Sequence, residues 1–280
     1  MRTPQHPLIS RLARDGFVAI AVAFLALRLL QVKPWDQSVD AYAYWSTAHG
    51  AMYGQVAGRM GAYLYSPAFA QLLTPITALP WPVFATIWSG LNLAAVWYLL
   101  GRWSLPAMLF LPIPFEIVSG NVHLLYAAAI VVGFRASASW ALMLITKVTP
   151  GVGLLWFAVR REWGALAVAL GLAAVLTAVS FLLDPSAWRA WLDILLASSS
   201  TPAQTPGWFL PVPLLVRLPV AAVVVAVAAW LRRSWLVPVG VVLAMPVLWL
   251  NSLAVLAACV PLWRVARRAA PAGEPIALSA

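Results

Sequence analysis

Long apolar runs make up most of the chain and leave little polar sequence between them. Hydrophobic residues account for 63% of the 280 residues and charged residues for only 9%, whereas a water-soluble domain carries about 25% charged residues. Too few charges remain to cover a globular surface in water, so lipid must surround most of the chain. Because lipid offers the backbone no hydrogen-bond partners, we expect the runs to form α-helices.

These runs predict an all-α fold, a polytopic bundle of about eight to ten membrane helices. A full span needs about 20 apolar residues, and several runs are shorter, so some helices should be short, broken or re-entrant. The runs, each bounded by charges, prolines or glycines, are residues 17–32, 83–100, 105–118, 122–134, 164–183, 214–231, 236–250 and 253–265.

The net charge of +10 has a distribution that indicates membrane orientation. Short loops enriched in Lys and Arg lie on the cytoplasmic side of a membrane, and one set of inter-helix boundaries holds 12 of the 18 basic residues. We therefore expect a multi-pass protein of the cell membrane with both termini in the cytoplasm, and no nucleic-acid partner. The basic residues concerned are Arg2, Arg11, Arg14, Arg102, Arg135, Arg160, Arg161, Arg232, Arg233, Arg264, Arg267 and Arg268.

The chain is expected to form a single transmembrane domain over residues 1–268, followed by a disordered cytoplasmic tail over 269–280. The largest polar excursion, residues 33–66, follows the first apolar run and should lie outside, where its pattern predicts an interfacial helix over 40–52. Residues 68–79 should then dip into the membrane. A second external segment, 185–213, should carry an amphipathic helix over 188–195.

Residues 140–157 are long enough to cross the membrane once, yet arginines at both ends favour the cytoplasm. Pro150 removes a backbone donor in the middle of this stretch and interrupts a helix there. Two half-helices that enter and return would satisfy both ends. Lys147 would then lie near the turn.

Ionisable groups at membrane depth are costly and tend to mark functional cavities. Asp40 begins the predicted interfacial helix, where it serves either as an N-cap or as a functional carboxylate. Lys147 either extends to the headgroups or binds an anion, and its broken-helix setting favours an anion such as phosphate. Arg28 either extends to the headgroups or joins Lys33 in an electropositive mouth.

Metal and cofactor chemistry is not expected. Cys259 is the only cysteine, and three scattered histidines make no recognisable zinc site. His123 is therefore expected to act as a hydrogen-bonding neighbour. Asp36 and Glu116 are not convincingly placed to form a second carboxylate for a metal, so we predict neither a metal nor a cofactor.

Four short motifs follow one another along the chain. They are Asp40 with Tyr44 and Trp45, then Tyr65-Ser66-Pro67, then Gly120-Asn121-Val122-His123, then Lys147-Val148-Thr149-Pro150. In this order and on this topology, the set resembles the polyprenyl-phosphate-dependent glycosyltransferases of the GT-C type, specifically glycosyltransferase family 87. That family includes bacterial mannosyltransferases and an arabinofuranosyltransferase. The resemblance spans residues 33–265.

The resemblance implies an inverting transfer of a sugar, with mannose favoured, from a polyprenyl-phosphate donor to a glycolipid or polysaccharide acceptor on the external face. A carboxylate must take the acceptor proton, and Asp40 lies on the appropriate side. The developing phosphate charge needs cations, for which Lys147 is the first choice, with Arg28 and Lys33 assisting. The residues expected to contact substrate are Tyr44, Tyr65, Asn121, His123 and Asn251.

One departure from the family pattern leaves other functions open. Members typically show a pair of histidines near the end, where this chain has Asn251 and Ser252. A catalytically degenerate member is therefore one alternative. A lipid or sugar transporter or flippase is another, because broken helices also suit transport sites. The concentration of polar residues in external loops favours interfacial chemistry over transport.

Overall fold

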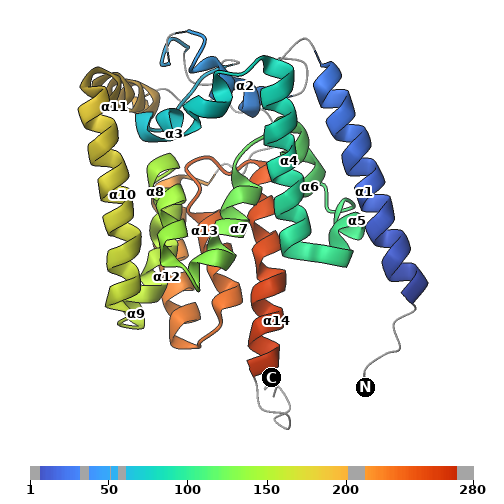
Figure 1. The fold of residues 1–280 in the computed structure, drawn as a ribbon. Helices are drawn as coiled ribbons and strands as arrows, with labels where there is room; N and C mark the ends of the chain where they lie inside the picture. The colour runs from blue at the N-terminus through green and yellow to red at the C-terminus, as the bar shows by residue number, and fades with distance from the viewer. Residues whose placement is uncertain (1–6, 32–37, 51, 56–60, 201–211, 270–280) are drawn as a thin grey trace.

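The computed structural model describes residues 7–31, 38–50, 52–55, 61–200 and 212–269, and within these residues every regular element is helical (Figure 1). The elements are α1 (Pro7–Leu30), α2 (Val39–Ser46), α3 (Pro67–Thr77), α4 (Trp81–Leu100), η1 (Gly101–Trp103), α5 (Ser104–Ala107), α6 (Pro112–Ser119), α7 (His123–Gly133), η2 (Ser137–Trp140), α8 (Ala141–Thr146), η3 (Thr149–Leu154), α9 (Leu155–Val159), α10 (Trp163–Leu183), α11 (Pro185–Ser200), α12 (Leu214–Trp230), η4 (Ser234–Leu236), α13 (Val237–Leu243), η5 (Leu250–Ala258) and α14 (Cys259–Ala269).

The all-α membrane bundle expected from the apolar runs is confirmed. Three helices in the described part of the chain are long and apolar enough to cross a membrane, namely Trp81–Ala107, Trp163–Leu183 and Leu250–Arg268. The bent pair α6 and α7 counts as a fourth if the two helices together form one span. The expected eight to ten membrane helices are reached only if α1 and the shorter apolar helices of 10–17 residues also enter the membrane.

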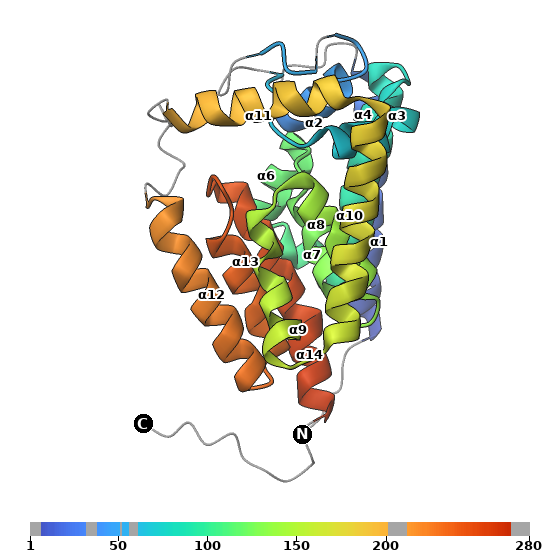
Figure 2. The ribbon, with the colours of Figure 1, turned by 90° about the vertical axis from the view of Figure 1, so that its left-hand side faces the viewer.

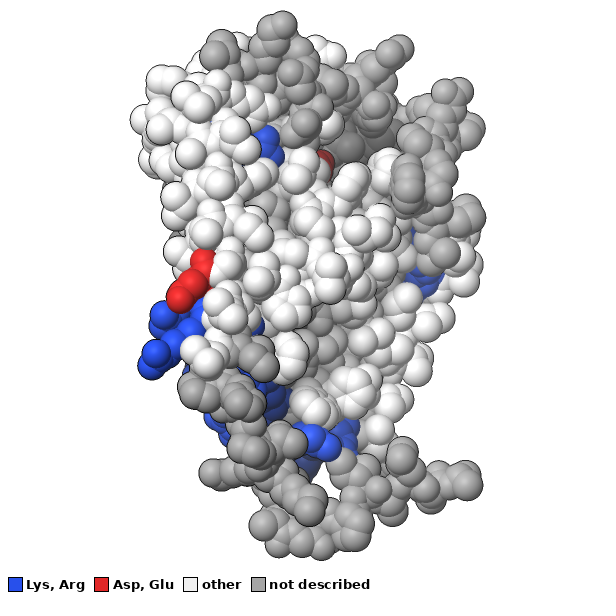
Figure 3. All heavy atoms as spheres, turned by 90° about the vertical axis from the view of Figure 1, so that its right-hand side faces the viewer, with Lys and Arg blue, Asp and Glu red and all other residues white. Residues whose placement is uncertain are grey.

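The bundle has two distinct ends. Helices α2, α3 and α11 lie together at one end, which we call the capped end (Figures 1 and 2). At the opposite end, α1 begins and α9, α12 and α14 end. We call this the basic end because its helix termini carry Arg11, Arg14, Arg160, Arg161, Arg232, Arg233, Arg264, Arg267 and Arg268. Figure 3 shows that most of the Lys and Arg on one face gather in its lower part.

Apolar side chains face outward along α10, which lies at one flank of the bundle in Figure 1. A protein in water rarely exposes so continuous an apolar surface, so this helix is suited to contact with lipid. Its exposed large hydrophobic residues are Trp163, Val168, Leu170, Leu172, Val175, Val179, Phe181, Leu182 and Leu183.

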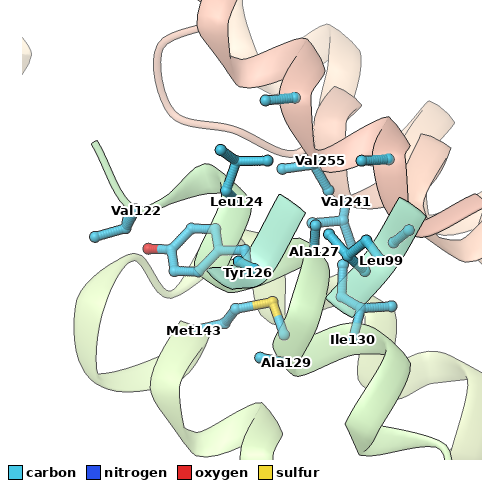
Figure 4. Packing of buried hydrophobic residues seen from close by; sticks show 14 of the residues in the cluster. Leu99, Val122, Leu124, Tyr126, Ala127, Ala129, Ile130, Met143, Val241 and Val255 are labelled. Atoms are coloured by element: carbon cyan, nitrogen blue, oxygen red, sulfur yellow. The ribbon is translucent and has the colours of Figure 1, made fainter. Parts of the chain in front are cut away.

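Helix α7 forms the centre of the core, where Leu124, Tyr126 and Ile130 are fully buried. These side chains belong to one apolar cluster with Val241 and Val255 from the C-terminal part of the chain (Figure 4). Side chains more than 100 positions apart in sequence thus close one apolar cluster. Contacts with several other helices therefore fix the position of α7.

Residues 137–159 form the predicted hairpin. Trp140, near its start, lies 6.2 Å from the ring of Phe157 near its end, so the two halves run alongside each other. Lys147 has extended backbone angles, φ −131° and ψ 113°, at the break between them. A β-carbon at Gly153 would come within 2.3 Å of the Trp140 ring, so a glycine allows the two halves to approach.

Several helix boundaries predicted from the sequence were wrong. The interfacial helix predicted over 40–52 ends at Ser46, and the helix predicted over 188–195 extends over Pro185–Ser200. The apolar run 236–250 is not one helix, because α13 ends at Leu243. There the buried Arg217 guanidinium donates to the carbonyl oxygens of Leu243 and Met245 at 2.7 and 2.8 Å, which stabilises the break.

Helices α6 and α7 are bent by 110° relative to each other. Gly120 sits between them with φ +71°, in the left-handed region, which glycine adopts without steric cost. A β-carbon here would lie 2.6 Å from the Ala41 β-carbon of α2. The bend therefore depends on glycine both for its backbone angles and for the approach of α2.

We predict that Gly120→Ala destabilises the fold by about 1–3 kcal/mol through backbone strain alone, with the clash against Ala41 adding to this. Gly171→Ala is the matched control, since a β-carbon there meets nothing within 4 Å. The measurement is thermal unfolding in detergent. Equal midpoints for the two variants would contradict the assigned role of Gly120.

Candidate active site

A polar cluster lies where the capped end meets the bend between α6 and α7. Helix α2 supplies Asp40 and Tyr44, and the bend supplies Asn121. Tyr65 precedes α3, and Lys147 comes from the tip of the hairpin. Four separate segments of the chain thus deliver polar side chains to one place.

Asp40 does not cap α2. The N-cap position belongs to Ser38, and Asp40 stands in the first turn of the helix. Its carboxylate instead accepts a hydrogen bond from the side chain of Asn121. Asp40 is only partly exposed, so its side chain serves the cluster and not the helix end.

Asn121 is the hub of the cluster. Its Oδ1 lies 3.3 Å from the Tyr44 hydroxyl and 3.2 Å from the Tyr65 hydroxyl, and it accepts from the backbone N–H of Val122 at 2.7 Å. With Oδ1 surrounded by donors, the NH₂ group is the part of the amide that donates to Asp40. The two tyrosine hydroxyls are also hydrogen-bonded to each other at 2.9 Å.

Lys147 faces the same cluster as Asp40. Its Nζ lies 5.0 Å from the centre of the Tyr65 ring, a cation–π contact. Its charge is close enough to Asp40 to lower the pKa of that carboxyl group. Both side chains are partly exposed, so neither is sealed inside the bundle.

The pKa of Asp40 is nevertheless raised above its usual value. Burial is the largest cause and the negative charge of Glu116 the second, while Lys147, His123 and Asn121 act in the opposite direction. A raised pKa makes a carboxylate a stronger base. Burial also raises the pKa of Tyr44 and Tyr65, so both phenols remain protonated donors.

Glu116 belongs to the site, although its sequence position gave no convincing reason to place it there. Its Oε1 accepts from the backbone N–H of His123 at 2.5 Å, and its Oε2 lies 3.0 Å from His123 Nδ1. His123 Nε2 in turn lies 3.4 Å from Ser252 Oγ. All three side chains are buried. A lone carboxylate in an apolar helix, seven residues before a histidine, was the available signal.

His123 and Asn251 lie behind the cluster. Both are buried, and the Asn251 amide donates to Ser119 Oγ at 3.3 Å. In this arrangement both side chains support the bend between α6 and α7. Their predicted contact with substrate stays a prediction.

Arg28 does not extend to the headgroups. It is buried against α6, with its guanidinium donating to the Val118 carbonyl oxygen at 2.5 Å and to Gln31 Oε1 at 2.7 Å. It therefore adjoins the bend from α1. Lys33, its predicted partner in a phosphate site, lies outside the described residues.

No group of three or more His, Cys, Asp or Glu side chains within the described ranges is arranged to hold a metal ion. Asp36 lies outside those ranges. The expectation of a metal-independent reaction therefore stays a prediction.

An apolar bundle that carries a partly exposed carboxylate and lysine at one end defines a membrane protein with an enzyme-like site. The model of glycosyltransferase family 87 matches residues 63–279, which is most of the chain. The chain therefore belongs to glycosyltransferase family 87, as the four motifs indicated, and is a membrane glycosyltransferase. Neither the curated proteins nor the solved structures contain a significant match.

The matched region includes Tyr65, Asn121, His123, Lys147 and Asn251. Asp40 and Tyr44 precede it. Their place in the site therefore rests on the geometry, in which α2 packs against the bend through Ala41 and Gly120.

We predict that Glu116→Gln shifts the pH dependence of sugar transfer. The Glu116 charge raises the pKa of Asp40, so its removal lowers that pKa and keeps Asp40 ionised to lower pH. The acidic limb of the kcat/KM profile should move toward lower pH. Asp193→Asn, an exposed acidic position on α11, is the control and should leave the profile unchanged. A shift toward higher pH would refute this electrostatic role.

Proposed function

We propose that this glycosyltransferase moves a sugar, with mannose the first candidate, from a polyprenyl-phosphate donor to a glycolipid or polysaccharide acceptor, with inversion at the anomeric carbon. The observation that carries the proposal is that Asp40 and Lys147 face one polar cluster. A base for the acceptor and a cation for the leaving phosphate are the two groups that this reaction needs.

Asp40 acts as the general base in this proposal. As the acceptor oxygen bonds to the anomeric carbon, its proton passes to the Asp40 carboxylate. The transition state resembles an oxocarbenium ion, as in glycoside hydrolysis. The Asn121 amide holds the carboxylate in place, and a pKa raised by burial increases its basicity.

Lys147 receives the leaving group. The bond between the anomeric carbon and the phosphate oxygen breaks, and its electron pair stays with the polyprenyl phosphate. A cation fixed where this charge develops stabilises the transition state. The base and the cation act on opposite faces of the sugar, which is why the configuration inverts.

The arginines support an orientation with the capped end outside the cell. Short loops rich in Lys and Arg remain cytoplasmic, and the basic end collects the arginines at the start of α1 and at the ends of α9, α12 and α14. Both termini would then be cytoplasmic in a multi-pass protein. The polar cluster would face the external leaflet, where a lipid-linked donor can reach it.

Asp40→Asn should lower kcat by roughly 10²–10⁴-fold, the range for loss of a positioned base, with little change in donor KM. The assay follows transfer of radiolabelled sugar from polyprenyl-phosphate mannose in proteoliposomes. Asp193→Asn is the matched control and should retain full activity. An active Asp40→Asn enzyme would remove the proposed base.

Lys147→Gln should raise the donor KM and lower kcat, because the phosphate loses its cation. Arg189→Gln, an exposed basic position on α11, is the control for the loss of one positive charge at the capped end. Donor KM and rate are measured with the same lipid-linked sugar. If the Lys147 variant matches the control, the phosphate site lies elsewhere.

A further inference from the structure

An open cleft of about 420 Å³ lies at the capped end, outside the cluster that holds Asp40 and Lys147. One wall is the external segment with Met52 and Tyr53, and the other is the beginning of α11. Its volume falls within the range of small-molecule sites, about 300–1,000 Å³. The lining residues are Met52, Tyr53, Gly54, Asp184, Ser186, Ala187 and Ala190.

Tyr53 joins this cleft to the candidate active site. Its hydroxyl donates to the backbone carbonyl oxygen of Tyr65 at 2.9 Å. The Tyr65 side chain lies under Lys147 and contacts Asn121, the partner of Asp40. A molecule that contacts Tyr53 in the cleft is therefore linked to the polar cluster through Tyr53 and Tyr65.

The groups that line the cleft suit a neutral polyhydroxy ligand. The Asp184 carboxylate accepts from Ser186 Oγ at 2.6 Å and from the Ala187 N–H at 3.0 Å, both at Oδ1. These bonds lower the pKa of Asp184, so it stays ionised. A carboxylate accepts about four hydrogen bonds, which leaves capacity for sugar hydroxyls.

Charge also separates this cleft from the proposed donor site. An ionised carboxylate repels a phosphate, whereas Lys147 attracts one. Tyr53 adds an aromatic ring of the kind that packs against the apolar face of a sugar. Burial and the nearby Asp184 charge raise the pKa of Tyr53, so its hydroxyl stays protonated and uncharged. The cleft thus fits the acceptor better than the lipid-linked donor.

We propose that the cleft between Tyr53 and the start of α11 binds a neutral sugar residue of the acceptor glycan, through the Tyr53 ring and the Asp184 carboxylate. This inference rests on the proposed function, because only a glycan acceptor has a further sugar to place there. The reactive hydroxyl of the acceptor then lies at Asp40, and the adjoining sugar occupies the cleft.

The experiment uses the full chain in nanodiscs and a variant that fills the cleft, Ala190→Phe. Leu192→Phe is the matched control, because Leu192 is exposed on the same helix and does not line the cleft. Saturation-transfer NMR with methyl mannoside, methyl glucoside and methyl arabinofuranoside reports binding directly. We expect at least one glycoside to bind the wild type and the Leu192 variant, and to lose its signal with Ala190→Phe.

The transfer assay supplies the second measurement. Ala190→Phe should raise the acceptor KM about tenfold and leave the donor KM unchanged. Asp184→Asn should raise the acceptor KM severalfold while its Oδ1 still accepts from the Ala187 N–H, since Asn side chains accept from first-turn N–H groups as Asp does. Unchanged acceptor KM and glycoside binding in Ala190→Phe would overturn the proposal, as would a wild type that binds no glycoside.

The two proposals fail in different ways. A wild type that transfers no sugar from any polyprenyl-phosphate donor overturns the proposed function, and with it the acceptor role of the cleft. Normal transfer with unaltered acceptor kinetics in Ala190→Phe overturns the acceptor cleft alone.

Discussion

The hydrogen bonds of one buried amide connect the parts of this site. Asn121 projects from the bend between α6 and α7 and contacts Asp40 and Tyr44 of α2 and Tyr65 before α3. Its position depends on Gly120, whose left-handed backbone turns the chain and whose missing β-carbon admits α2. In a bundle held by apolar contacts alone, α2 could slide over its neighbours. The amide fixes α2 in register, and with it the carboxylate.

The site combines a cation with two carboxylates in surroundings of low polarity, where charges interact more strongly than in water. Lys147 faces Asp40, while Glu116 lies deeper and is bonded to His123. This division separates two roles. The outer pair is partly exposed, whereas the inner carboxylate is buried and acts on Asp40 through its charge.

Apolar length, prolines and arginines were sufficient to predict the bundle and the hairpin with Lys147 at its tip, and the four motifs predicted the family. The four motifs also named Asp40, Tyr65 and Asn121, which the fold brings together. The part played by Glu116 was missed, because the effect of its charge on Asp40 joins positions far apart in sequence. The end of α13 was missed for a similar reason, since Arg217 of another helix determines it. Local patterns do not contain such long-range contacts.

The hairpin that carries Lys147 has a consequence for how this enzyme tolerates change. Trp140 is wedged at the base of that hairpin, where Gly153 leaves room for its ring. Because both arms pack on this ring, a bulkier residue at position 153 would spread them and displace the ammonium group at the far tip. On the role proposed for Lys147, sugar transfer would then slow through a buried substitution at the opposite end of the hairpin, with Asp40 and Lys147 themselves unaltered.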